Sequence, residues 1–200
     1  MGDYTLYQPL TRTDRVTVRI YRTSIALTCL LLVALAAVLA VSPAIGAGRA
    51  SIYFDLFLGL LYFAVGLSVF FIHLYIGSFK RKLIWLYFIS LAALAVVFIK
   101  GGGDALSFIS GVPAAALLFL PLAGCMGFVA AKEAFCFRLA EGYLLAIAMP
   151  LYLFAFATGG LGRYGIESGL LFIAALYVLF ASRKVFMPLH CDIGDKSAYR

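Results

Sequence analysis

The chain has 200 residues, of which 64% are hydrophobic and only 12% are charged, and its formal net charge is +7. So few charged groups cannot cover the surface of a water-soluble domain of this size. The composition therefore excludes an ordinary soluble protein and predicts one whose helices lie in a lipid bilayer.

The first predicted element is a polar, basic segment, residues 1–23. Arg12, Arg15, Arg19 and Arg22 recur at a spacing that would bring them to one helical face, whereas the β-branched residues at positions 16–18 and 20 weaken a helix. We interpret this segment as a cytoplasmic stretch that lies on the lipid headgroups.

Long apolar runs then predict an all-α fold, a polytopic bundle of six transmembrane helices. The runs cover residues 24–45, 52–77, 83–99, 112–130, 143–158 and 166–181. A helix needs roughly 20 residues to cross about 30 Å of hydrocarbon, so the third, fifth and sixth runs are short. The alternative is five spans with one re-entrant run. Six spans give a transmembrane domain at 24–181 and a cytoplasmic tail at 182–200.

The basic residues predict the orientation. With six spans, thirteen of the 16 Lys and Arg residues lie on one side, and only Arg49, Lys100 and Arg163 lie on the other. Positive charge favours the cytoplasmic side, so we expect both termini there, in the cell inner membrane or a thylakoid membrane. Contact with anionic membrane lipid accounts for the basic charge, and nucleic-acid binding is not needed to explain it.

The second predicted span, residues 52–77, carries its small and polar residues on one face. We expect this face to pack against other helices, because lipid is a poor neighbour for polar groups and small residues allow close helix contact. Its members are Asp55, Gly59, Tyr62, Gly66, His73 and Gly77. His73 is also an ionisable group inside a predicted span, which marks it as a functional candidate.

Three side chains near the cytoplasmic surface form a hypothetical metal site: His73, Glu133 and Cys136. Imidazole, carboxylate and thiolate are common ligands of zinc and iron. No Cys-x-x-Cys or His-x-x-His spacing supports the site, and the sequence identifies no cofactor. The alternative is that Lys132 and Arg138 reach the interface with Glu133 and Glu141 as their partners.

A second group of residues at this surface is predicted to contact a partner protein or lipid. It comprises Phe135, Phe137, Arg138, Asp192, Asp195 and Lys196. The four cysteines predict no disulfide framework, since Cys136 and Cys191 face a reducing compartment and Cys29 and Cys125 lie inside spans.

Several strings occur together in a characteristic order. They are Asp14-Arg15, Tyr21-Arg22, His73-Leu74-Tyr75, Lys132-Glu133-Ala134-Phe135-Cys136-Phe137 and Asp192-Ile193-Gly194-Asp195-Lys196-Ser197. In this order they resemble a family of uncharacterised small integral membrane proteins of cyanobacteria and other bacteria with plastid relatives. The resemblance spans nearly the whole chain, although His190-Cys191 departs from the pattern. It implies a bacterial or photosynthetic membrane setting and no reaction.

The predicted function is therefore non-enzymatic: an accessory or assembly protein whose cytoplasmic face engages lipid or a membrane protein complex. One alternative is a metal- or thiol-dependent membrane enzyme or redox relay. The other is a carrier of an apolar ligand. A charged ligand is disfavoured, because the sequence places no carboxylates near the midplane of the membrane.

Overall fold

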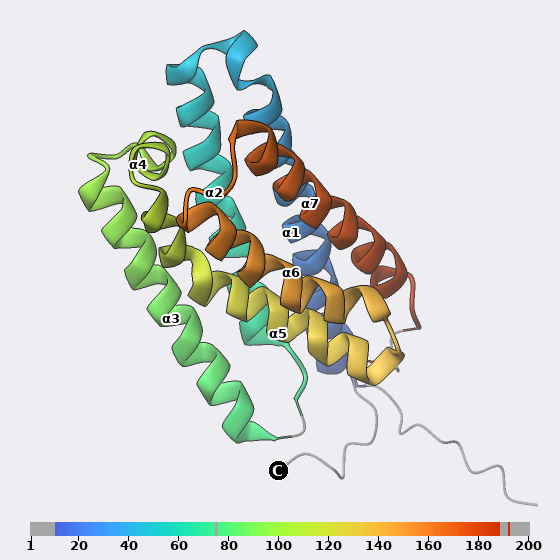
Figure 1. Ribbon diagram of the computed structural model, residues 1–200. Helices are drawn as coiled ribbons and strands as arrows, with labels where there is room; N and C mark the ends of the chain where they lie inside the picture. Colours follow the sequence, from blue (N-terminus) through green and yellow to red (C-terminus); the bar gives the residue numbers. More distant parts are fainter. Residues whose placement is uncertain (1–10, 75, 189–191, 193–200) are drawn as a thin grey trace, which may run out of the picture.

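A computed structural model describes residues 11–74, 76–188 and 192 of the chain. These residues form seven α-helices and one 3₁₀-helix, and no strand occurs among them (Figure 1). Six helical segments are long and apolar enough to cross a membrane. The predicted all-α, multi-pass fold is confirmed.

Helix α1 (Arg12–Ile45) begins well before the predicted start at residue 24. Thr11 and Asp14 form a capping box: the Thr11 hydroxyl accepts the Asp14 N–H, and the Asp14 carboxylate accepts the Thr11 N–H at 2.9 Å. The helix also continues past Pro43 and ends at Ile45, followed by Gly46 with a φ of +84°. The Ser42 hydroxyl donates to the carbonyl of Leu39, whose usual helical donor Pro43 lacks.

Helix α2 (Ala47–Phe71) is shorter at its far end than predicted. Ile72 is extended, so His73 lies in the connection to α3 (Gly77–Lys100), and Gly77 is the first residue of α3. The prediction of one helix over residues 52–77 was wrong. The break buries the Ile72 side chain and brings the ring of His73 to Thr17 of α1.

The loop predicted after the third span contains a short helix, α4 (Ala105–Gly111), which Asp104 caps by accepting the Ser107 N–H. The 3₁₀-helix η1 (Pro113–Phe119) follows and leads directly into α5 (Leu120–Phe137). Pro121 stands in the first turn of α5, where a missing N–H costs no helical bond. Residues 132–137, expected in a turn, are the last residues of α5.

Helices α6 (Ala140–Ala157) and α7 (Arg163–Val185) complete the bundle. Small residues bring α5 and α6 close together: a Cβ atom at Gly142 would lie 2.4 Å from the Ala130 carbonyl oxygen, and one at Gly127 would lie 3.3 Å from the Cα of Ala146. Helix α1 packs between α2 and α7, while α5 packs between α3 and α6.

The bundle has two distinct ends. The start of α1 and the end of α7 lie at the same end, together with the α2–α3 and α5–α6 connections (Figure 1). We call this the basic end, because most of the lysines and arginines lie there. The opposite end carries Gly46, α4 and the α6–α7 loop.

Candidate functional site

A large cavity opens toward the opposite end of the bundle. Its volume is about 890 Å³, and every described helix except α3 contributes to its wall. Pockets that hold small molecules in proteins have volumes of roughly 300–1,000 Å³, so this cavity is of ligand-binding size.

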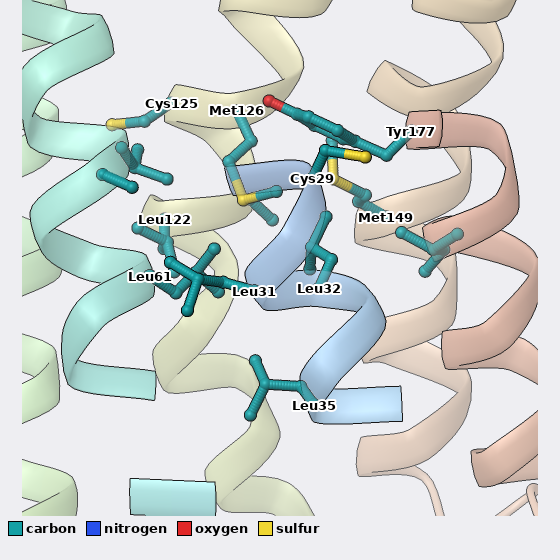
Figure 2. Packing of buried hydrophobic residues seen from close by; sticks show 14 of the residues in the cluster. Cys29, Leu31, Leu32, Leu35, Leu61, Leu122, Cys125, Met126, Met149 and Tyr177 are labelled. Carbon is teal, nitrogen blue, oxygen red and sulfur yellow. The ribbon is translucent and has the colours of Figure 1, made fainter. Parts of the chain in front are cut away.

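The inner part of the cavity is apolar. Leu32 and Leu35 of α1, Leu61 of α2 and Met126 of α5 line it, with Met149 of α6 facing them. Figure 2 shows these side chains together with Cys29 and Tyr177, which belong to the same buried cluster. Apolar walls of this kind offer hydrocarbon good contacts and offer water no hydrogen bonds.

The mouth of the cavity is polar. Arg163, at the first position of α7, donates from Nε to the Glu167 carboxylate at 2.8 Å and from Nη2 to the Ser42 hydroxyl at 3.3 Å. It thereby bridges α7 and α1 across the rim. Ser107 and Ser110 of α4 line another part of the wall. The cavity thus combines an apolar interior with charged and hydroxyl groups at one end.

Asp104 lies beside this part of the wall, but its carboxylate already accepts hydrogen bonds from neighbouring residues. Its carboxylate accepts hydrogen bonds from the hydroxyl of Ser51, at 2.5 Å, and from the hydroxyl and N–H of Ser107. Burial alone would raise the pKa of Asp104, but these hydrogen bonds outweigh it and hold the pKa below its usual value.

The basic end contains a second unusual feature, a buried ion cluster centred on Glu133 of α5. The Glu133 carboxylate accepts from the Tyr21 hydroxyl at 2.6 Å and from Lys132 at 2.8 Å, and it lies 2.5 Å from Lys184 Nζ. Glu133, Tyr21 and Lys184 have no solvent-exposed surface. Lys184 Nζ also lies 4.0 Å from the centre of the Phe137 ring, a cation–π contact.

Asp192 extends this cluster to the first helix. Its carboxylate pairs with Lys184 and with Arg22, whose Nε donates to it at 2.7 Å. Arg22 also donates to the carbonyls of Val185, Met187 and Pro188, at and beyond the end of α7. Such carbonyls lack helical donors, so Arg22 caps the last helix from the first. The cluster holds three cations and two carboxylates: Arg22, Lys132, Lys184, Glu133 and Asp192.

His73 lies next to this cluster. Its Nε2 is 3.2 Å from the Thr17 hydroxyl, while its buried Nδ1 has no hydrogen-bond partner among the described residues. Burial lowers the pKa of His73 below its usual value, and the nearby ammonium of Lys132 acts in the same direction.

The three residues of the hypothetical metal site lie at the basic end but serve different contacts. His73 faces Thr17, Glu133 is held by two lysines and a tyrosine, and Cys136 is exposed. In the described part of the chain, no group of three or more His, Cys, Asp or Glu residues is arranged to hold a metal ion.

The residues predicted to contact a partner or lipid are divided among different settings. Phe135 is 80% exposed, whereas Phe137 is half-buried beneath Lys184 and Asp192 is buried in the ion cluster. Arg138 is exposed and ends α5 with a φ of +55°. Asp195, Lys196 and the His190-Cys191 pair lie outside the described residues.

The residues of the predicted packing face of the second span also differ in how deeply they are buried. Tyr62 and Gly66 are buried, and a Cβ atom at Gly66 would lie 2.4 Å from the Tyr87 hydroxyl oxygen. Asp55 is half-buried and accepts the Ala105 N–H. Gly59 and Gly77 are exposed, and Gly59 has open space where a side chain would project, so neither supports close packing here.

Sequence reasoning missed Tyr21, Arg22 and Lys184 as members of one site. Arg22 was interpreted as one of four arginines on a helical face and Lys184 only as a basic charge, although each stands beside a long apolar run. The unusual position of such charges within helices long enough to span a membrane was the available signal.

Comparison with known proteins identifies a family and no individual relative. Neither a curated protein nor a solved structure matches the chain. A family model described as "Uncharacterized integral membrane protein (DUF2301)" matches residues 67–200, two thirds of the chain. The match includes α3 to α7, Glu133, Lys184 and Asp192. The chain therefore belongs to the DUF2301 family of integral membrane proteins.

Proposed function

We propose that the protein is a non-enzymatic, lipid-binding membrane protein that holds the hydrocarbon part of a lipid in its central cavity. The observation that carries this proposal is an apolar cavity of about 890 Å³ with polar groups at one end. That distribution matches an amphipathic ligand, whose chains are buried and whose head remains near water.

The length of the cavity supports the same ligand class. Its wall follows α1 from Leu32 to the chain turn at Gly46. At about 1.5 Å per residue this stretch measures roughly 21 Å, longer than one leaflet of a bilayer whose hydrocarbon core is about 30 Å thick. A lipid tail can therefore lie along it at full length.

A partner-binding role for the basic end has less support. Of the two aromatic residues expected to mediate it, Phe135 is exposed and Phe137 lies under Lys184. A metal- or thiol-dependent reaction also has less support, because both oxygens of Glu133 already contact cations.

We also infer that the basic end is cytoplasmic and that the cavity opens toward the other side of the membrane. The support is the positive-inside rule: the connections are short, and among the described residues only Arg49, Lys100 and Arg163 place a basic side chain at the opposite end.

The test is to measure lipid retained by the purified protein. Wild-type protein should carry a stoichiometric lipid through purification in detergent, detected by native mass spectrometry and by extraction. Ala123→Phe and Ala50→Phe, on different walls of the cavity, should each fill part of it and reduce the retained lipid severalfold.

Ala92→Phe is the matched control, because Ala92 is exposed on α3, the one described helix that does not line the cavity. It should retain lipid as the wild type does. Size-exclusion profiles establish that each variant is folded. Equal retention by folded Ala123→Phe, Ala50→Phe and wild-type protein would overturn the proposal.

A further inference from the structure

We propose that the ligand is a two-chain lipid with an anionic phosphate headgroup, and that Arg163 binds the phosphate at the mouth of the cavity. This inference rests on the proposed function and names the class of lipid. Two observations carry it: the volume of the cavity relative to its length, and the hydrogen bonds that Arg163 makes and leaves unmade.

The volume exceeds what one chain would fill. With carbon–carbon bonds of about 1.5 Å and angles of about 111°, an extended chain advances about 1.25 Å per carbon, so a path of roughly 21 Å takes about 17 carbons. At about 30 Å³ per water-sized group, a cavity of about 890 Å³ holds about 30 such groups. A single chain would take up little more than half of this space. Two chains side by side, of about 15 carbons each, would fill it.

The headgroup is inferred from the geometry of Arg163. The Nε–H donates to the Glu167 carboxylate, and one N–H of Nη2 donates to the Ser42 hydroxyl. Nη1 has no hydrogen bond to the residues described here, so the Nη1–Nη2 edge retains three of its four N–H donors. This edge has the fork geometry that binds phosphate through two parallel hydrogen bonds.

The charges around the mouth favour an anion at this edge. Arg163 is the one cationic side chain among the described residues that line the cavity. Glu167 neutralises part of its charge, but from the Nε side. Two further acids lie at this end, Asp104 and Asp55, and they accept hydrogen bonds from Ser51, Ser107 and the Ala105 N–H. Among the described residues, neither of them forms an ion pair with Arg163. A phosphate held by Arg163 would lie at the polar end, with its chains directed along the apolar wall.

The experiment offers the wild type equal amounts of dioleoylphosphatidylglycerol and dioleoylglycerol in detergent and measures both bound lipids by native mass spectrometry. The two lipids share their chains and differ in the phosphate headgroup. We expect wild-type protein to prefer the phosphate lipid by about tenfold, the effect of one or two charge-assisted hydrogen bonds. Arg163→Gln should lose that preference and keep binding dioleoylglycerol.

Arg49→Gln is the control, since Arg49 lies at the same end, is exposed and does not line the cavity. It should keep the wild-type preference. Inorganic phosphate at the lipid concentration should displace neither lipid, because the chains supply most of the contact. Displacement of dioleoylphosphatidylglycerol would show that Arg163 binds free phosphate and would overturn the assignment of a lipid headgroup.

The two proposals fail separately. If Arg163→Gln keeps the wild-type headgroup preference while Ala123→Phe expels both lipids, Arg163 does not select the headgroup and the cavity still binds lipid. If wild type binds both lipids equally, the phosphate assignment is wrong. If neither Ala123→Phe nor Ala50→Phe alters lipid binding, both proposals are overturned.

Discussion

Replacing Glu133 by Gln should destabilise the protein far more than the same replacement at Glu141. Both glutamates form ion pairs at the basic end, but the environments differ. Glu133 and Lys184 are fully buried, whereas the Arg183 side chain that pairs with Glu141 is 56% exposed. The two substitutions change the same atoms in the same way, so the comparison isolates the difference in partners: Glu133 contacts two cations with little or no exposure, and Glu141 contacts one cation that is in water.

The magnitude follows from what Glu133 neutralises. Its charge faces Lys132 and Lys184, and without it only the Asp192 carboxylate balances three buried or half-buried cations. Breaking a buried pair by removing one partner costs about 3–5 kcal/mol, and the amide still accepts hydrogen bonds, so we expect about 3 kcal/mol. The Glu141–Arg183 pair should contribute only about 0–1 kcal/mol, because water screens the exposed Arg183 guanidinium.

The assay is thermal unfolding of each purified variant in one detergent. A loss of about 3 kcal/mol corresponds to a decrease in Tm of about 6–12 °C for a chain of this size. Glu141→Gln should change Tm by less than about 4 °C. Equal decreases for the two variants would refute the reasoning.

A double variant tests whether the loss is electrostatic. Adding Lys184→Met to Glu133→Gln removes the cation that was left without its partner, so the double variant should be more stable than the two separate losses predict. Strict additivity would show that Glu133 contributes through packing and not through charge.

Two further predictions concern the α2–α3 region. Gly66→Ala should lower the unfolding free energy by about 1–3 kcal/mol, because the new methyl group would overlap the Tyr87 hydroxyl, while Gly59→Ala meets open space and should not destabilise; equal unfolding midpoints for the two variants would contradict this. The lowered pKa of His73 means that the folded state binds its proton less readily than the unfolded chain, so stability should fall as the pH decreases below the usual histidine pKa of 6.5. His73→Gln should flatten the decline in Tm between about pH 6.5 and pH 5, and an unchanged slope would show that another group causes it.

Hydropathy predicted the six spans because each span is long and continuous in sequence, and a bilayer leaves few alternatives to helix. The helix ends were harder to predict. The start of α1 depends on the Thr11–Asp14 capping box, which is a local signal. We gave more weight to the low helix propensity of the β-branched residues that follow it. The end of α2 has no glycine or proline to mark it, and its break accompanies the burial of Ile72 in the folded bundle.

The two sites depend on contacts between distant parts of the chain. Tyr21 and Glu133 are 112 residues apart, and Arg22 and Asp192 are 170 apart, so no local spacing indicates either pair. The cavity is a property of how seven helical segments pack around a space, and the leucines and methionines that line it look like ordinary membrane residues in sequence. Glu133 was predicted as a metal ligand or as a partner of the interfacial bases, and Asp192 as a contact for a partner protein or lipid. Tyr21, Arg22 and Lys184, which pair with them, came from the predicted cytoplasmic segments at 1–23 and 182–200.

Arg22 has a consequence for the biogenesis of the protein. A ribosome releases α1 into the membrane long before it has translated α7. The Arg22 guanidinium therefore has neither the Asp192 carboxylate nor its carbonyl acceptors until almost the whole chain has been made. Until then, the newly inserted first helix carries a charge that lipid tolerates poorly. The contacts of the first helix are therefore completed by the last segments of the chain to be synthesised, and a chain interrupted before α7 lacks the groups that pair with Arg22.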